Sequence, residues 1–157
     1  MTIHFEYEKP KVLQALRYHF ISRPEIRFMI IMVNVFALAS AALYYFKKVT
    51  PTAFLTSSFL WFTLMISFWF VMPALVYKRA ATFKDHFTVN LEDNHLFLEN
   101  ERGSKSWPWA SFSSFIESPH FFHLYFDARS FFLLPKEAFK GDTVHEARNF
   151  LSSKIKK

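Results

Sequence analysis

Two long runs of uncharged residues limit what this chain can fold into more than any other feature. The first run covers residues 28–46 and the second covers residues 49–77, and only Lys47 and Lys48 lie between them. As a helix that rises ~1.5 Å per residue, the first run spans roughly 28 Å, close to the ~30 Å hydrocarbon core of a bilayer. Helices of a soluble protein need a polar face for water, and these runs have none. We therefore predict a transmembrane hairpin over residues 28–77.

The prolines and the two lysines suggest how this hairpin is divided. We expect spans at about 28–46 and 53–77, joined by a turn at 47–52. A cleaved signal peptide is the alternative for the first run, because two sites of the A-x-A type lie at 37–39 and 39–41. The 27 residues before the run contain three acids, which is untypical of such a leader and favours a retained span.

Basic residues beside the runs predict the orientation of the hairpin. Positive residues are enriched on the cytoplasmic side of membrane spans. Six of them flank the outer ends of the hairpin and only two lie in its turn, which predicts that both termini are cytoplasmic. The six flanking residues are Arg17, Arg23, Arg27, Lys78, Arg79 and Lys84.

The distribution of charge argues against nucleic-acid binding. The net charge of +6 comes entirely from residues 1–82, which hold nine Lys or Arg and three acids, whereas residues 83–157 hold ten of each. The basic excess therefore lies beside the apolar runs, where anionic lipid headgroups would be, and the polar domain is neutral. We predict a lipid bilayer as a partner and no nucleic acid.

The polar ends of the chain predict an α+β protein. Residues 1–27 contain an alternating segment, "TIHFEYE", followed by an amphipathic helix with Val12, Leu13, Leu16 and Phe20 on one side, which Pro24 ends. Residues 78–157 contain several short strand patterns and then a helix. Thr143 and Glu146 have the spacing of a capping box at the start of that helix. Its apolar stripe consists of Val144, Ala147, Leu151 and Ile155.

These patterns predict a small antiparallel β-sandwich or barrel, closed by the C-terminal amphipathic helix. A domain of this size has a thin core, so an added N-terminal strand would help it. The sequence leaves open whether that strand joins the sheet.

Three segments carry a resemblance to a known family: "IHFEY" at 3–7, "WASFSSFIES" at 109–118 and "FFLLPKEAF" at 131–139. The chain resembles the YcxB-like small bacterial membrane proteins, which have an N-terminal extended segment, two spans and a pleckstrin-homology-like domain. The resemblance implies this domain for residues 78–157 and a location in the bacterial inner membrane. It implies no activity. The motif positions, which we expect to be structural, are Trp109, Leu134, Pro135, Lys136 and Phe139.

No motif in the sequence predicts catalysis, a metal or a cofactor. The chain has no cysteine and only two glycines, so thiolate chemistry and Gly-rich phosphate loops are excluded. His120 and His123 lie in a strand-and-turn context without a nearby carboxylate pair, and His145–Glu146 lacks the second histidine of a zincin helix. We therefore expect a protein that is not an enzyme.

The remaining hypotheses concern binding. A neutral, Phe-rich domain tethered at the inner leaflet is suited to a protein partner, because tethering raises its effective concentration there. We predict Phe121 and Phe131 as contact residues. An immunity protein against a membrane-acting toxin, a lipid-sensing module and a homo-oligomer are the alternatives. Glu92, Asp93 and Asn94 occupy the loop that binds phosphoinositides in pleckstrin domains, so a headgroup would need another surface. Lys84, Arg102, Lys105 and Lys136 could supply one.

Overall fold

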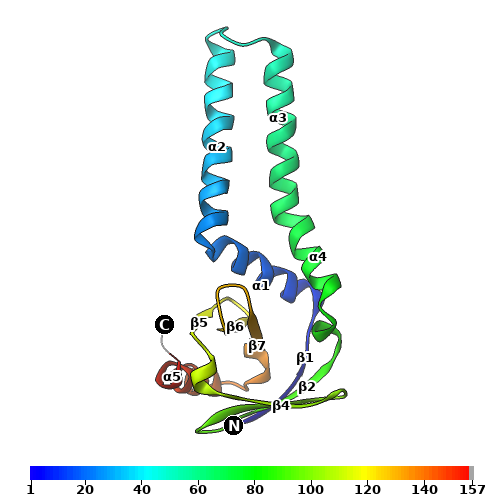
Figure 1. The fold of residues 1–157 in the computed structure, drawn as a ribbon, viewed down its shortest axis with the longest axis vertical. Helices are drawn as coiled ribbons and strands as arrows, with labels where there is room; N and C mark the ends of the chain where they lie inside the picture. Colours follow the sequence, from blue (N-terminus) through cyan, green and yellow to red (C-terminus); the bar gives the residue numbers. More distant parts are fainter. Residues whose placement is uncertain (156–157) are drawn as a thin grey trace. The chain divides into compact units, whose positions relative to one another are not determined.

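The computed structural model describes residues 1–155, leaving aside the side chains of residues 81 and 82, and it divides into two compact units. We call residues 1–15 together with 81–155 the β unit, and residues 16–80 the hairpin unit. Helix α1 (Lys9–Ser22) contributes residues to both. The chain is α+β, as predicted, with two antiparallel sheets and two long apolar helical segments (Figure 1).

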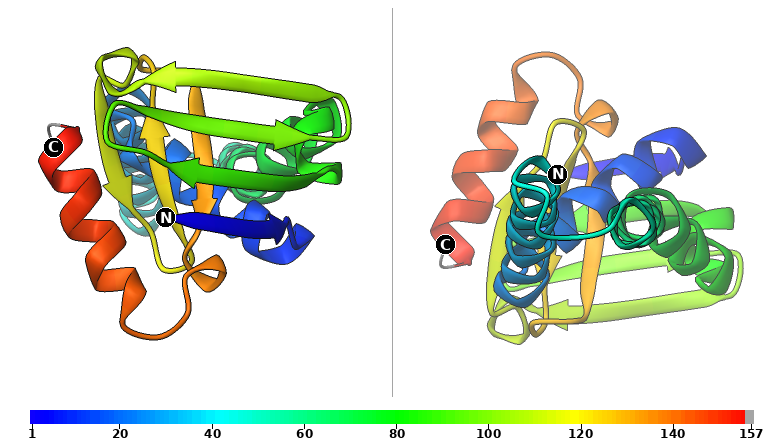
Figure 2. Two further views of the ribbon diagram at one scale, coloured as in Figure 1. Left: turned by 90° about the horizontal axis from the view of Figure 1, so that it is seen from below. Right: turned by 90° about the horizontal axis from the view of Figure 1, so that it is seen from above.

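The first sheet of the β unit includes the N-terminal strand. Its order is β1 (Thr2–Glu6), β2 (His86–Leu91), β3 (His95–Asn100) and β4 (Gly103–Pro108), and all its neighbours are antiparallel. Ile3 lies opposite Val89, so the N-terminal segment joins residues more than eighty positions away in sequence. Both β1 and β4 are therefore edge strands (Figure 2).

The second sheet has three antiparallel strands: β5 (Ser114–Glu117), β6 (Phe121–Tyr125) and β7 (Phe131–Pro135). It crosses the first sheet, and α5 (Thr143–Lys154) lies beside it (Figure 2). Short 3₁₀ turns occur at Ala81–Lys84, Trp109–Ser111 and Lys136–Ala138. Strand pairing among the described residues does not join the two sheets, so the predicted barrel is not a closed one.

Both sheets and α5 bury their apolar faces in one core. Phe87, Val89 and Leu91 alternate into it from β2, and Phe122 and Leu124 enter it from β6, whose five residues are all buried. The predicted stripe of α5 is also confirmed, because Ala147, Leu151 and Ile155 are buried and Val144 packs against the same core.

Two local predictions about the helices are wrong. Helix α5 has no side-chain cap: Asp142 is its N-cap, and the Thr143 hydroxyl donates 2.7 Å back to the carbonyl of Lys140. In α1 the buried side is rotated from the predicted one, because Ala15 and His19 are buried with Val12 and Leu16, whereas Leu13 and Phe20 are only half-buried. An alanine and a histidine carry too little hydrophobic weight to reveal such a face in sequence.

The hairpin unit contains α2 (Pro24–Tyr45), then α3 (Pro51–Ile66), a π-helical segment at Ser67–Val71 and α4 (Met72–Arg79). Both apolar segments, Pro24–Tyr45 and Pro51–Arg79, are long and apolar enough to cross a membrane by length and composition. They begin a few residues earlier than predicted, because proline is favoured in the first helical turn. Thr50 caps the second segment by accepting a 3.2 Å hydrogen bond from the amide of Ala53.

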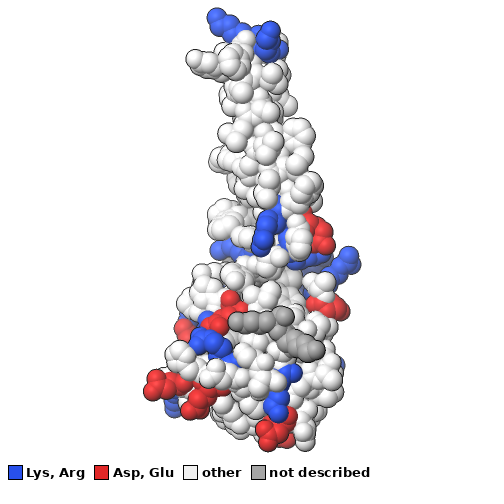
Figure 3. Space-filling view, turned by 90° about the vertical axis from the view of Figure 1, so that its left-hand side faces the viewer, with Lys and Arg blue, Asp and Glu red and all other residues white. Residues whose placement is uncertain are grey.

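Polar side chains join the two long helices of the hairpin unit. The Trp61 indole donates to Asn34 Oδ1 at 3.2 Å, and the hydroxyls of Ser40 and Ser57 are 2.7 Å apart. These contacts pack one helix against the other. The shaft of the hairpin carries no charge colour in Figure 3, whereas its tip, which holds Lys47 and Lys48, is basic.

Candidate functional site

The most distinctive surface of the β unit is an open cleft of about 420 Å³ between strand β4 and the start of β7. Its walls are mainly aromatic, and its rim is basic. We call it the aromatic cleft and define it by Arg102, Lys105, Trp107, Phe126, Phe131 and Phe132. All of these residues belong to the β unit.

The aromatic wall is built by residues that come together from different strands. The Trp107 ring, at the end of β4, lies 5.2 Å from that of Phe126 and 5.9 Å from that of Phe132 on β7. Phe126 in turn stacks on Phe112 at 4.8 Å. Such contacts between rings at 4.5–7 Å favour a rigid wall. The cleft is thus preformed rather than a gap between mobile side chains.

Two cations stand at the rim, and no carboxylate is among the lining residues. Lys105 Nζ lies 5.3 Å from the centre of the Trp107 ring, a cation–π distance. Arg102 Nε is 3.3 Å from Asp85 Oδ2, which orients the guanidinium. Both basic side chains are exposed, so the cleft combines an apolar wall with positive charge.

The two predicted contact residues differ in accessibility. Phe131 is half-buried and lines the aromatic cleft. Phe121 is only 2% exposed and lies 6.3 Å from the ring of Tyr7, so it is a core residue and not an exposed anchor. Alternation cannot reveal this burial, because β6 is buried on both of its faces.

The family-motif residues hold the β unit together. Leu134, Pro135 and Phe139 are buried, and the Trp109 indole donates 2.8 Å to the carbonyl of Glu92, which fixes the β2–β3 loop. Lys136 belongs to an ion network around Glu117.

The Glu117 network connects β5 to α5. Arg148 binds both carboxylate oxygens of Glu117, at 2.8 and 2.6 Å, and Lys136 Nζ lies 2.6 Å from Oε1. The hydrogen bonds from Arg148, together with Lys136, lower the pKa of Glu117 to about 2. Sequence reasoning missed Glu117 and Arg148, because nothing local in the sequence relates two residues 31 positions apart.

Arg17, predicted to flank the membrane, makes a specific contact in the hairpin unit. Its Nε donates 2.7 Å to the carbonyl of Trp69, and its guanidinium lies 5.6 Å and 5.5 Å from the ring centres of Trp69 and Phe70. Pro73 lacks the N–H that would donate to the Trp69 carbonyl in a regular α-helix. Arg17 gives this carbonyl a charged side-chain donor.

The other flanking basic residues make weaker contacts. Arg23 lies 3.7 Å from Glu25, and Arg27 Nε lies 3.4 Å from the carbonyl of Ile21. Lys78, Arg79 and Lys84 are exposed. These positions leave the predicted orientation of the termini as a prediction.

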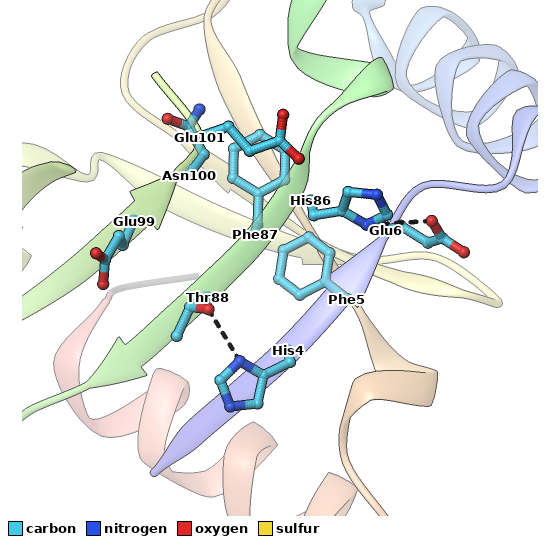
Figure 4. Close-up of a pocket in the computed structure, with 9 residues that line it drawn as sticks. All are labelled: His4, Phe5, Glu6, His86, Phe87, Thr88, Glu99, Asn100 and Glu101. Carbon is cyan, nitrogen blue, oxygen red and sulfur yellow. Dashed lines mark hydrogen bonds and ion pairs between the residues drawn. The ribbon is translucent and has the colours of Figure 1, made fainter. Parts of the chain in front are cut away.

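The outer face of the first sheet forms a second, shallow hollow of about 660 Å³ (Figure 4). His4 hydrogen-bonds to Thr88 at 2.9 Å, and His86 lies 3.2 Å from Glu6. Histidines and glutamates therefore face the same side, but no group of three or more potential ligands among the described residues could hold a metal ion. We assign this face no binding chemistry.

The histidine pair considered from the sequence does not form a site. His123 is fully buried, where its Nε2 lies 2.9 Å from the hydroxyl of Ser118, whereas His120 is half-buried. His19, on α1, is also buried. Burial and the nearby Arg23 lower the pKa of His19 to about 4, so it is neutral at neutral pH.

The fold defines the class as an α+β protein that joins two long apolar helices to a unit of two antiparallel sheets. Residues 91–151 match the model of the YcxB-like protein family, which confirms the resemblance over that stretch. The stretch is less than half of the chain and runs from the last residue of β2 into α5. Comparisons with curated proteins and with solved structures gave no match.

Proposed function

We propose that this protein is a membrane-anchored, non-enzymatic interaction protein that presents a pleckstrin-homology-like domain to a protein partner. The two apolar segments act as the anchor, in the bacterial inner membrane with both termini cytoplasmic. The single observation that carries the proposal is the aromatic cleft, because aromatic rings with an arginine at the rim have the composition of an interface centre, to which Lys105 adds a second basic side chain.

Two features of the β unit support the comparison with pleckstrin domains. A four-stranded sheet packs with a three-stranded sheet around one core, and a C-terminal helix contributes its apolar stripe to that core. The β2–β3 loop, at Glu92, Asp93 and Asn94, is acidic, which disfavours the phosphoinositide mode of such domains. This loop favours a protein partner over the alternative of lipid sensing.

The experiment is photo-crosslinking of the full-length protein in its native membrane. A benzoyl-phenylalanine crosslinker replaces Ser104, an exposed residue at the rim of the cleft, or Asn149, an exposed residue on α5 that serves as the matched control. We expect one protein adduct from position 104, none of the same mass from position 149, and at least a fivefold loss of the adduct when Lys105→Glu is added.

Equal adducts from both positions, or none from position 104, would overturn the proposal. If the adduct contains a secreted toxin, the immunity alternative is the correct form of the function. Lipid adducts alone would favour a lipid-sensing module.

A further inference from the structure

We propose that the free edge of β4 and the aromatic cleft beside it together bind an extended peptide with acidic residues and an aromatic anchor. This inference rests on the proposed function, since it names the chemistry of the partner. It makes the partner an added strand of the first sheet rather than a folded surface.

Strand β4 is available for such pairing. It is the last strand of the first sheet, it pairs only with β3 among the described strands, and five of its six residues are exposed (Figure 2). About half of the N–H and C=O groups of an edge strand point away from its neighbour and can pair with another chain. Addition of a strand at such an edge is a recurrent mode of peptide recognition.

The register of β4 shows where the side chains of an added strand would lie. Lys105 is opposite Leu98, and Trp107 is opposite Leu96, and both leucines are buried on the inner face of the sheet. Side chains alternate between faces, so Lys105 and Trp107 also belong to the inner face. Inward side chains of an added strand would continue this row and enter the aromatic cleft.

The charge of the cleft selects the peptide. An inward-facing lysine on an edge strand discourages pairing with an apolar strand, because its ammonium would be covered without a counter-charge. A glutamate of the peptide beside Lys105 supplies that counter-charge, and Arg102, which is paired with Asp85, offers further N–H donors at the rim. Lys105 then acts as a specificity element that admits acidic segments and rejects others.

The openness of the cleft favours a peptide over a small amphiphile. Small-molecule sites usually enclose most of the ligand surface, whereas this cleft is largely open to solvent. A phenylalanine can enter the aromatic wall from an extended chain without being enclosed. Two elements therefore act together: the edge binds the backbone, and the cleft binds the anchor.

A designed heptapeptide, Thr-Glu-Thr-Phe-Thr-Glu-Thr, tests this geometry, because its glutamates and phenylalanine share one face when it is extended. The fluorescein-labelled peptide is titrated into the purified full-length protein in detergent micelles and followed by anisotropy. We expect saturable binding, a loss of at least tenfold when lysines replace both glutamates, and a similar loss in the Lys105→Glu protein. Lys140→Glu, an exposed charge reversal elsewhere in the β unit, is the matched control and should change binding less than twofold.

Backbone pairing has its own readout. One variant of the peptide is N-methylated at every threonine and the other at both glutamates and the phenylalanine, so each lacks the N–H groups of one edge. One variant should lose binding and the other keep it within about twofold. The bound peptide should also slow amide hydrogen exchange in residues 103–108.

Three results would overturn the inference: no binding, equal binding by both methylated peptides, or exchange protection of β4 by anionic vesicles but not by the peptide. Protection of β4 that rises with protein concentration alone would also overturn it in favour of a second copy of this chain. These outcomes are separable from failure of the proposed function. A partner crosslinked at position 104 can persist while the peptide fails, and the peptide can bind while no partner is found.

Discussion

Phenylalanine has opposite surroundings in the two units of this molecule. In the β unit Phe122 is fully buried, whereas in the hairpin unit Phe59 is 75% exposed and Leu38 is 72% exposed. Large contiguous apolar surfaces are rare on proteins that contact only water. This difference in the exposure of large apolar side chains supports a bilayer around the hairpin unit and water around the β unit.

The polar side chains of the two units also differ, in how far along the sequence their bonding partners lie. In the β unit, charged side chains pair across long sequence distances, as Glu117 does with Arg148 and Lys11 does with Glu137. In the hairpin unit, hydroxyls donate to carbonyls of their own helix, as Thr56 does to Thr52 and Thr63 to Phe59. Polar groups in a bilayer must find partners inside the protein, and the local bonds of the hairpin unit meet that requirement.

The largest expected effect distinguishes a buried phenylalanine of the β unit from an exposed phenylalanine of the hairpin unit. Phe122→Ala should destabilise the β unit by about 3–5 kcal/mol, because it opens a cavity among buried residues. Phe59→Ala, an exposed residue of the hairpin unit, should leave the β unit within about 0.5 kcal/mol of the parent. Hydrogen exchange of β6 peptides in the full-length protein in micelles measures both. Equal destabilisation by the two variants would contradict the division into units.

The Glu117 network gives the β unit a characteristic pH dependence. The pKa of the Glu117 carboxyl is lowered from 4.5 to about 2 by its hydrogen bonds to Arg148, so the folded state favours the charged form. The stability from this group is fully present above about pH 4.5 and is lost as the pH falls towards 2.

Glu117→Gln should therefore destabilise the β unit by about 2 kcal/mol at neutral pH, because Arg148 and Lys136 lose their charged partner. The difference from the parent protein should shrink between pH 4.5 and 2. Glu99→Gln, which changes an exposed carboxylate of the first sheet, is the control and should change the stability at neutral pH by less than about 0.5 kcal/mol. Urea titrations at several pH values provide the measurement. A difference that stays constant with pH would refute the assignment.

Arg17 tests how the hairpin unit accommodates Pro73. Arg17→Gln should raise the amide exchange of residues 66–74 roughly tenfold, equivalent to about 1.4 kcal/mol, because the carbonyl of Trp69 loses a charged donor. Pro73→Ala restores the missing N–H, so the effect of Arg17→Gln should shrink when both changes are combined. Strictly additive effects of the two substitutions would count against the pairing. Arg23→Gln is the matched control.

The smallest effect concerns the contact between α2 and α3. Asn34→Leu should weaken the helix pair by only about 0.6 kcal/mol, since interhelical hydrogen bonds in membranes are modest. Trp61→Phe should have a similar effect, and the double variant should be little worse than either one. Resistance of the hairpin to unfolding in SDS is the measurement. A loss of several kcal/mol would mean that this bond, rather than packing, holds the helices together.

The sequence by itself determined the two apolar helices, the α+β class, the strand patterns and the stripe of α5. These features depend on local periodicity, proline positions and the absence of charge, which a linear pattern records directly. The YcxB-like resemblance came from short motifs in which Trp109, Leu134, Pro135 and Phe139 are buried in the β unit, so it indicated the fold before it could indicate a site.

Only the tertiary structure decided which distant residues meet. The fold pairs β1 with β2 and brings Glu117 to Arg148. It places the Arg17 guanidinium at the carbonyl of Trp69. It also buries Phe121, whereas Phe131 lines the cleft. The aromatic cleft itself depends on the crossing of two sheets, because Trp107 and Phe132 approach each other only when β4 and β7 pack into one unit. Such contacts arise from the packing of whole faces, and no local pattern in the sequence specifies them.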